Sequence, residues 1–503
     1  MLNPPGSVKA AHPLADPQEA RRVLEALPAQ DPLRALDELL RWQESVATAP
    51  GLSLGRKIDL LLAIESAARP LVSQLAGEYL AAKRPTPVVE NRLWNAIHGY
   101  WKQAGEGCVR VLEDAVPGAK EARAVDECLP ALLVCTLSCL VQQIKWMHFR
   151  YGPIDAAVWG TFNRVYALAE SRRLADAKVA CSAQQGESTP RREFLRGAML
   201  GAVSPNSLLP QAIELAERLI DGHAARFVLA HSPAPDLPYW TDLGQAMAPQ
   251  RLARTPGAAP GLRYFGAGAA LEDLTLLART LDTTGQISLV RAGLGVGADA
   301  QTLLDVLRHL AAHWSPRAPQ RRHTRHIVRS RLSVAHGFDG VVAVLLRGSA
   351  PDLDGPGMES WVVEDVSAGG FGALVPPING DWLRVGTLLA MRPEGSESPV
   401  VGVVRRVNRT ADQQARVGIQ TLSKSPIVAE FSLDRSTERG VLLRSGDRRS
   451  DEALIALRPG VFASGQELRA ERDGRRCLFQ PQGIAERGAD YEIAHFRERV
   501  VDA

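Results

Sequence analysis

The chain has 503 residues, with 59 Lys plus Arg, 56 Asp plus Glu and a formal net charge of +3. At roughly 150 residues per domain, this length predicts about three domains. With 45% hydrophobic and 23% charged residues, the composition excludes a mainly disordered, collagen-like or small disulfide-stapled protein. The net charge is too small to indicate a nucleic-acid partner by itself, so any basic surface must be local.

Targeting signals and metal ligands are not apparent. Residues Met1–Leu14 contain three prolines and no apolar core, so we expect no signal peptide. The longest apolar run, Leu129–Val141, is shorter than the roughly 20 residues that span a bilayer, and we expect a buried helix instead. The six cysteines form no CxxC pair and no zinc-ligand spacing. We therefore expect a reduced, cytoplasmic protein with no membrane span and no metal site.

Residues 1–225 are predicted to form an α-helical domain. Asp31 followed by Pro32 is typical of an N-cap with proline at the first helical position. Apolar residues then recur at helical spacing in successive segments. The helices form either a solenoid of the tetratricopeptide kind or, since no internal period is clean, a single helical domain. Their aromatic stripes are core positions or, alternatively, a groove for a protein partner.

Residues 226–315 show a mixed α/β pattern. The predicted strands and helices are, in order, Phe227–Ala230, Leu262–Phe265, Leu271–Leu281, Gln286–Val290 and Ala300–His313. The glycine-rich run Gly293–Gly297 has the position of a phosphate-binding turn between a strand and a helix. It lacks the last glycine of GxGxxG and the P-loop Lys-Ser/Thr. We interpret it as a flexible connection, with Asp299 as the N-cap of the helix that follows.

Residues 316–432 change to short β-rich runs separated by turns, which predict a small antiparallel barrel. The runs are Leu332–Ala335, Val341–Leu346, Trp361–Val366, Gly372–Val375, Leu388–Met391, Val400–Val407 and Arg416–Leu422. Ser349–Gly357 is interpreted as an inserted hairpin loop. Residues 433–503 are predicted to be a β-rich extension packed on the barrel, ending in a helix or strand near Glu492–Val500. The fold class is therefore multidomain α+β.

The densest basic segment is Arg317–Arg331, which holds six arginines and two histidines and no acidic residue. Like charges at this density disfavour a packed segment in the absence of an anion. The segment is either a solvated linker or a phosphate-binding segment that becomes ordered when its ligand arrives.

A second motif is Asp365-Val366-Ser367-Ala368-Gly369-Gly370, at the end of a predicted strand. Asp365 and Ser367 are two residues apart, so in extended backbone they point to the same face. The glycines allow positive φ or a close approach of the backbone to a ligand. Alone, this pattern is also that of a common turn.

Together, Arg321-x-x-x-Arg325 and Asp365-x-Ser367-x-x-Gly370 resemble the motifs of the PilZ domain, which binds the bacterial second messenger cyclic di-GMP. The resemblance covers about residues 317–432, and the helical part is similar to that of long PilZ proteins. It implies that Arg321 and Arg325 grip phosphate and guanine. It also implies that Asp365, Ser367 and Gly370 form the complementary floor on the barrel.

These side chains suit such a ligand. The arginine fork matches phosphate oxygens or the guanine O6/N7 edge, and a carboxylate accepts from the guanine N1–H and amine. Arg322 and Gly369 are additional candidates. Arg405 and Arg406 lie on one predicted strand with opposite side-chain directions, so one of them lines the site or both face solvent. Three histidines near the motif have no metal-ligand geometry, and we expect them to be solvated: His323, His326 and His336.

The resemblance therefore implies a cyclic di-GMP receptor. We expect it to be non-catalytic, because no HExxH or GxSxG motif is present. Ligand binding at the Arg-rich linker and the barrel would re-aim the helical domain and so regulate an unidentified protein partner. One alternative is an interaction scaffold with a ligand-blind barrel. Another is nucleic-acid binding through the Arg cluster, which the lack of interleaved aromatic residues argues against.

Overall fold

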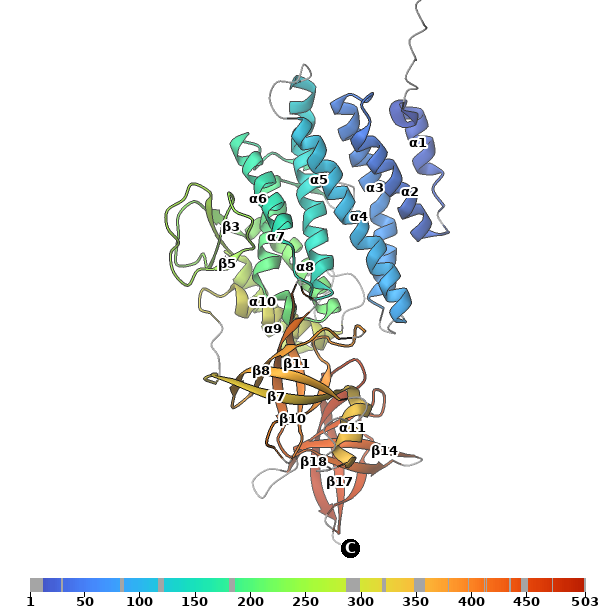
Figure 1. The fold of residues 1–503 in the computed structure, drawn as a ribbon, viewed down its shortest axis with the longest axis vertical. Coiled ribbons are helices and arrows are strands. Elements are labelled where there is room, and N and C mark those ends of the chain that lie inside the picture. The colour runs from blue at the N-terminus through green and yellow to red at the C-terminus, as the bar shows by residue number, and fades with distance from the viewer. Residues whose placement is uncertain are drawn as a thin grey trace, which may run out of the picture. The chain divides into compact units, whose positions relative to one another are not determined.

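The computed structural model divides the chain into two compact units (Figure 1). The helical unit comprises residues 1–150, 154–205 and 210–319, and the barrel unit comprises residues 151–153, 206–209 and 320–503. The structure describes residues 12–28, 30–81, 86–115, 122–180, 186–285, 299–318, 323–347, 358–378, 380–396, 398–410, 412, 414–433, 436–444, 451–472 and 474–501. The domain boundaries expected at residues 225, 315 and 432 remain predictions.

The first part of the helical unit is a series of long helices, and α2 to α5 run alongside one another in Figure 1. The predicted N-cap is confirmed, because the Asp31 side chain accepts a hydrogen bond from Arg34 N at the start of α2. The helices are α1 (Pro17–Glu25), α2 (Pro32–Thr48), α3 (Leu54–Tyr79), α4 (Pro87–Asp114), α5 (Ala122–His148), α6 (Ala156–Ser171), α7 (Pro190–Ala202) and α8 (Pro210–His223).

Helix α5 lies in the core of this unit, packed against α3, α4, α6, α7 and α8. By length and composition alone, Asp126–His148 could cross a membrane, but 72% of its most apolar window is buried inside the unit. It therefore has the burial of a core helix, as expected from Leu129–Val141. Cys108 Sγ and Cys135 Sγ lie 3.9 Å apart in this core, so these thiols serve as apolar packing groups.

The rest of the helical unit is a small antiparallel sheet with two further helices. The sheet has the order β3-β6-β4-β5, and Asn163 of α6 donates to Asp242 O, Gln245 O and Met247 O beside it. The predicted strands and helices here are confirmed except for residues 286–298, which lie outside the described residues. The elements are β1 (Val179–Ala180), β2 (Glu187–Ser188), β3 (Val228–Ala230), β4 (Tyr239–Asp242), β5 (Gln250–Arg251), β6 (Leu262–Gly266), α9 (Ala270–Thr284) and α10 (Ala300–Trp314).

The first barrel of the barrel unit is closed, antiparallel and six-stranded, with the order β10-β11-β12-β9-β8-β7. The prediction of a small antiparallel barrel is therefore confirmed. Trp361, Leu389 and Met391 are among the fully buried side chains of its interior. Its strands are β7 (His326–His336), β8 (Glu359–Ser367), β9 (Gly370–Val375), β10 (Leu388–Pro393), β11 (Val400–Arg409) and β12 (Ala415–Ser423).

One predicted strand, Val341–Leu346, is wrong, because it forms part of helix α11 (Gly337–Arg347). A continuous apolar run does not distinguish a buried strand from a buried helix. Here the chain turns at Gly337, with φ 78°, and Asp490 Oδ2 accepts a hydrogen bond from Phe338 N at the helix start. The expected hairpin loop Ser349–Gly357 lies outside the described residues.

The expected β-rich extension is a second closed barrel, with the order β13-β14-β15-β18-β17-β16. When β7 to β12 are matched in chain order to β13 to β18, the two barrels have the same neighbours around the ring. The chain therefore contains one barrel topology twice. The strands are β13 (Ile427–Ser432), β14 (Thr437–Arg444), β15 (Glu452–Leu457), β16 (Leu468–Arg472), β17 (Arg475–Arg487) and β18 (Glu492–Val501).

The two barrels and α11 share a hydrophobic core, and Figure 1 shows α11 beside both barrels. This core joins Phe338 and Val341 of α11 to Val403 of β11 and to Tyr491 and Ile493 of the second barrel. All five residues are nearly or fully buried. The barrel interiors form separate cores, so the shared core is an additional layer that holds the barrels together.

Candidate functional site

The candidate site is built on the turn between β8 and β9. Asp365 and Ser367 lie on β8, opposite Gly372 and Gly370 of β9, and they share one side of the strand as the spacing predicts. Ser367 Oγ donates to Gly370 O at 3.3 Å. The turn is therefore closed by one of the motif's own side chains.

Gly370 is required for steric reasons. Its φ is 154°, and a Cβ added there would lie 1.9 Å from Ile419 O on β12. Gly372 has a related role, because a Cβ at that position would lie 2.7 Å from Asp365 Oδ2. Sequence reasoning identified Gly370 but missed Gly372, which lies just past the motif. These two glycines let the backbone approach β12 and leave room for the carboxylate.

The structure brings together Arg325 of the Arg-x-x-x-Arg motif and Asp365 of the Asp-x-Ser-x-x-Gly motif. Arg325 Nη1 donates to Asp365 Oδ2 at 3.0 Å and lies 3.0 Å from Oδ1. The Arg325 and Asp365 side chains are 42% and 26% exposed, so the pair lies at the surface. Arg321 and Arg322 lie outside the described residues.

The basic segment is only partly what the charge density predicts. Arg329 and Arg331 belong to strand β7, so this end of the segment is part of the barrel and not of a free linker. The reason is local: both side chains point to solvent, where repulsion is screened. The Arg331 N–H donates to Glu394 at 3.0 Å. Just before the segment, Arg251 donates to Ser315 O and Pro316 O.

Two histidines near the motif have defined contacts. The His323 ring lies against Gly369, where a Cβ would be 2.9 Å from its Cδ2 atom. His336 is stacked on Trp382 with ring centroids 3.8 Å apart, and burial lowers its pKa. His336 is therefore half-buried and not fully solvated as expected. Among the described residues, no group of three or more His, Cys, Asp or Glu is placed to hold a metal ion.

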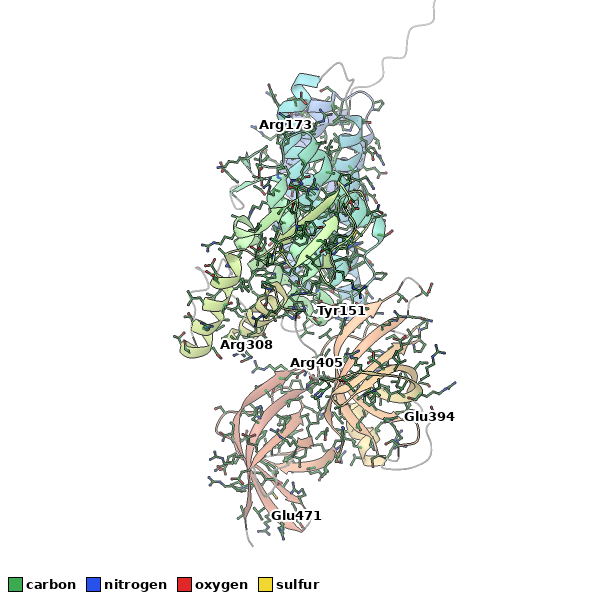
Figure 2. The ribbon with its side chains drawn as sticks, turned by 90° about the vertical axis from the view of Figure 1, so that its left-hand side faces the viewer. Tyr151, Arg173, Arg308, Glu394, Arg405 and Glu471 are labelled. Carbon is green, nitrogen blue, oxygen red and sulfur yellow. The ribbon has the colours of Figure 1, made fainter. Side chains whose placement is uncertain are left out.

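Arg405 lies on β11 and contacts both barrels, as Figure 2 shows. Its Nε donates to Gln420 Oε1 at 2.7 Å. Its Nη1 and Nη2 donate to Glu486 of the second barrel at 2.7 and 2.6 Å. Glu486 is a functional candidate that sequence reasoning missed. No local pattern marks it, because it is 81 residues from Arg405 in the chain.

The helical unit contains a buried charge cluster around Arg196. Arg196 donates to Glu193 at 2.5 Å and to Glu217 at 2.8 Å, while Lys145 donates to Glu214 at 2.8 Å. Burial alone would raise the pKa of Glu217, but Lys145 and Arg196 outweigh it and lower that pKa to about 2. A cavity of about 280 Å³ adjoins Glu193 and Arg196. Because the cations here are matched by carboxylates, we assign the cluster a structural role.

Comparison with known proteins concerns the N-terminal part of the chain. Residues 18–234 match a family model described as "Cyclic-di-GMP receptor FimW, N-terminal domain". The matched residues make up less than half of the chain. No curated protein matches the chain. The matched residues run from α1 to β3 and do not include the Arg325–Asp365 pair, so the family match and the motif are independent observations.

Proposed function

We propose that the chain is a non-catalytic cyclic di-GMP receptor of the cytoplasm whose site is the β8–β9 turn and the preceding arginines. The observation that carries the proposal is the 3.0 Å contact between Arg325 and Asp365, because these residues belong to two separate motifs and are 40 residues apart in the chain. The family match over residues 18–234 supports the same ligand through a different part of the chain.

The ligand is bound by complementary groups on two segments. Arg321 and Arg325 take its phosphates and a guanine edge. Asp365 accepts from the guanine N1–H and amine, Ser367 adds a hydroxyl, and Gly370 leaves the backbone open. Arg322, Gly369 and Arg405 are additional contacts. Because the Arg325–Asp365 pair is partly exposed, it is worth less than about 1 kcal/mol and can rearrange around the ligand at little cost.

The output is a change in the Arg-rich linker between the barrel and the helical domain. Ligand binding neutralises part of the like charge of Arg317–Arg331 and fixes the side chains that bind it. We propose that this change re-aims the helical domain, which then regulates a protein partner. No membrane span and no nucleic-acid partner are required.

Titration calorimetry on the full chain tests this proposal. Cyclic di-GMP should bind with micromolar or tighter affinity, and excess GTP should not compete. Arg325→Ala should weaken binding at least about tenfold, since hydrogen bonds to charged groups contribute about 1.5–3 kcal/mol.

The matched control is Arg416→Ala. Arg416 pairs with Glu364 of the same strand β8, 3.6 Å away, but it lies outside the motif. Its loss should change affinity less than about twofold. Equal effects of the two variants would contradict the assigned site. The absence of saturable binding would leave the interaction scaffold, or nucleic-acid binding with steep salt dependence.

A further inference from the structure

The second barrel contacts the first through Arg405 of β11, two strands away from the motif turn. Strand β12 lies between β9 and β11, so Gln420 is opposite Gly370 on one side and Val403 on the other. Thr421 N also donates to Gly369 O at 3.0 Å. Because neighbouring strands are about 4.8 Å apart, β11 lies about 10 Å from the turn. This distance is within reach of a long side chain and an extended dinucleotide.

Arg405 is the cation that β11 places there. Gln420, opposite Gly370, orients its Nε at 2.7 Å, and Glu486 of the second barrel binds both terminal nitrogens. Glu486 Oε1 also accepts from Tyr491 OH at 3.1 Å, and the Tyr491 ring is fully buried in the shared core. A carboxylate fixed to the second barrel therefore holds the whole fork of an arginine beside the candidate site.

The second barrel is not an equivalent binding site. Its strand order repeats that of the first barrel, so the segment before β13 corresponds to the one before β7. That segment, residues 421–426, contains Lys424 and no arginine, and residues 444–452 contain no Asp-x-Ser-x-x-Gly sequence. The second barrel therefore lacks both motif halves, while it supplies a charged group at the edge of the first barrel's site.

We propose that Glu486 sets the affinity of the candidate cyclic di-GMP site by competing with a ligand phosphate for Arg405. This inference rests on the proposed function. A phosphodiester and a carboxylate both fit a guanidinium fork bidentately, so one can replace the other. The Arg405 and Glu486 side chains are 39% and 22% exposed, so an incoming phosphate can reach the guanidinium and water can reach the carboxylate that it displaces. Ligand binding would then break a contact between the barrels.

The experiment compares cyclic di-GMP titrations of the full chain with those of Glu486→Gln, Arg405→Ala and the double variant. Glu486→Gln removes the competing charge but keeps an acceptor for Tyr491 OH, so affinity should rise about two- to fivefold. Arg405→Ala should lower affinity about tenfold. The double variant should bind no tighter than Arg405→Ala, because the gain depends on Arg405.

The control is Glu430→Gln, which makes the same charge change on an exposed residue of the second barrel paired with Arg439. It should leave affinity unchanged. If the unchanged chain binds but Glu486→Gln binds equally or more weakly with an unaltered melting curve, Glu486 only joins the barrels and the inference is rejected alone. If neither the unchanged chain nor any variant binds, the proposed function fails, and this inference fails with it.

Discussion

Replacing Gly370 by alanine should open the first barrel locally at the β9–β12 pairing. The added Cβ would lie 1.9 Å from Ile419 O, whereas real Cβ contacts are not shorter than 3.0 Å. The two strands must therefore move apart by about 1 Å. Overpacking of this kind costs about 1–3 kcal/mol, and a central value of about 2 kcal/mol corresponds to about a thirtyfold increase in local opening.

Hydrogen exchange of the full chain measures this opening directly, because protection reports local stability rather than the unfolding of a whole unit. Peptides from β9 and β12 should lose protection about thirtyfold, and peptides from β15 and β18 should serve as an internal reference. Gly418→Ala is the matched control, since its Cβ would meet Arg406 Cβ at an ordinary 3.5 Å. Equal protection in the two variants would refute the steric argument. Under the proposed function, Gly370→Ala should also abolish ligand binding.

Two further predictions concern the helical unit. Arg196→Met should lower its stability by about 3–5 kcal/mol, because it removes the cation that Glu193 and Glu217 share in the buried cluster. Arg191→Met removes a surface pair with Asp176 and should cost less than about 1 kcal/mol in the same urea titration. Burial lowers the pKa of three histidines to about 4, namely His98, His148 and His309. The unfolded chain binds these protons near pH 6.5, so unfolding free energy should fall as pH drops from 6.5 towards 4, by up to about 3 kcal/mol per histidine. A melting temperature that stays constant over that window would contradict the prediction.

The sequence predicts the element types well where periodicity and capping agree. Asp31 with Pro32, and Asp299 before α10, are N-caps that the structure confirms by side-chain bonds to the backbone. Prediction fails at Val341–Leu346, where an unbroken apolar run carries no period. Its helical state depends on burial between two barrels, which local sequence does not encode.

The candidate site is also predictable from the sequence only in part. The motif spacing places Arg325 and Asp365 together because both belong to short segments at paired strand ends. It does not reveal Glu486, because the Arg405–Glu486 contact depends on how two barrels pack through α11 and the Tyr491 core. Nor does residue patterning reveal the repeated barrel. Barrel identity lies in the order of strand neighbours, and the second copy lacks the residues that mark the first.

The repeated topology has a consequence for the shape of the dose response. A chain with two equivalent pockets could respond cooperatively within a single molecule. Here only the first barrel carries the motif residues, so under the proposed function each chain has one site of this kind. With one ligand molecule per site, its occupancy follows a simple hyperbola with ligand concentration. The second barrel can move the midpoint of that curve through Glu486 without making it steeper, so it acts as a sensitivity setting and not as a second sensor.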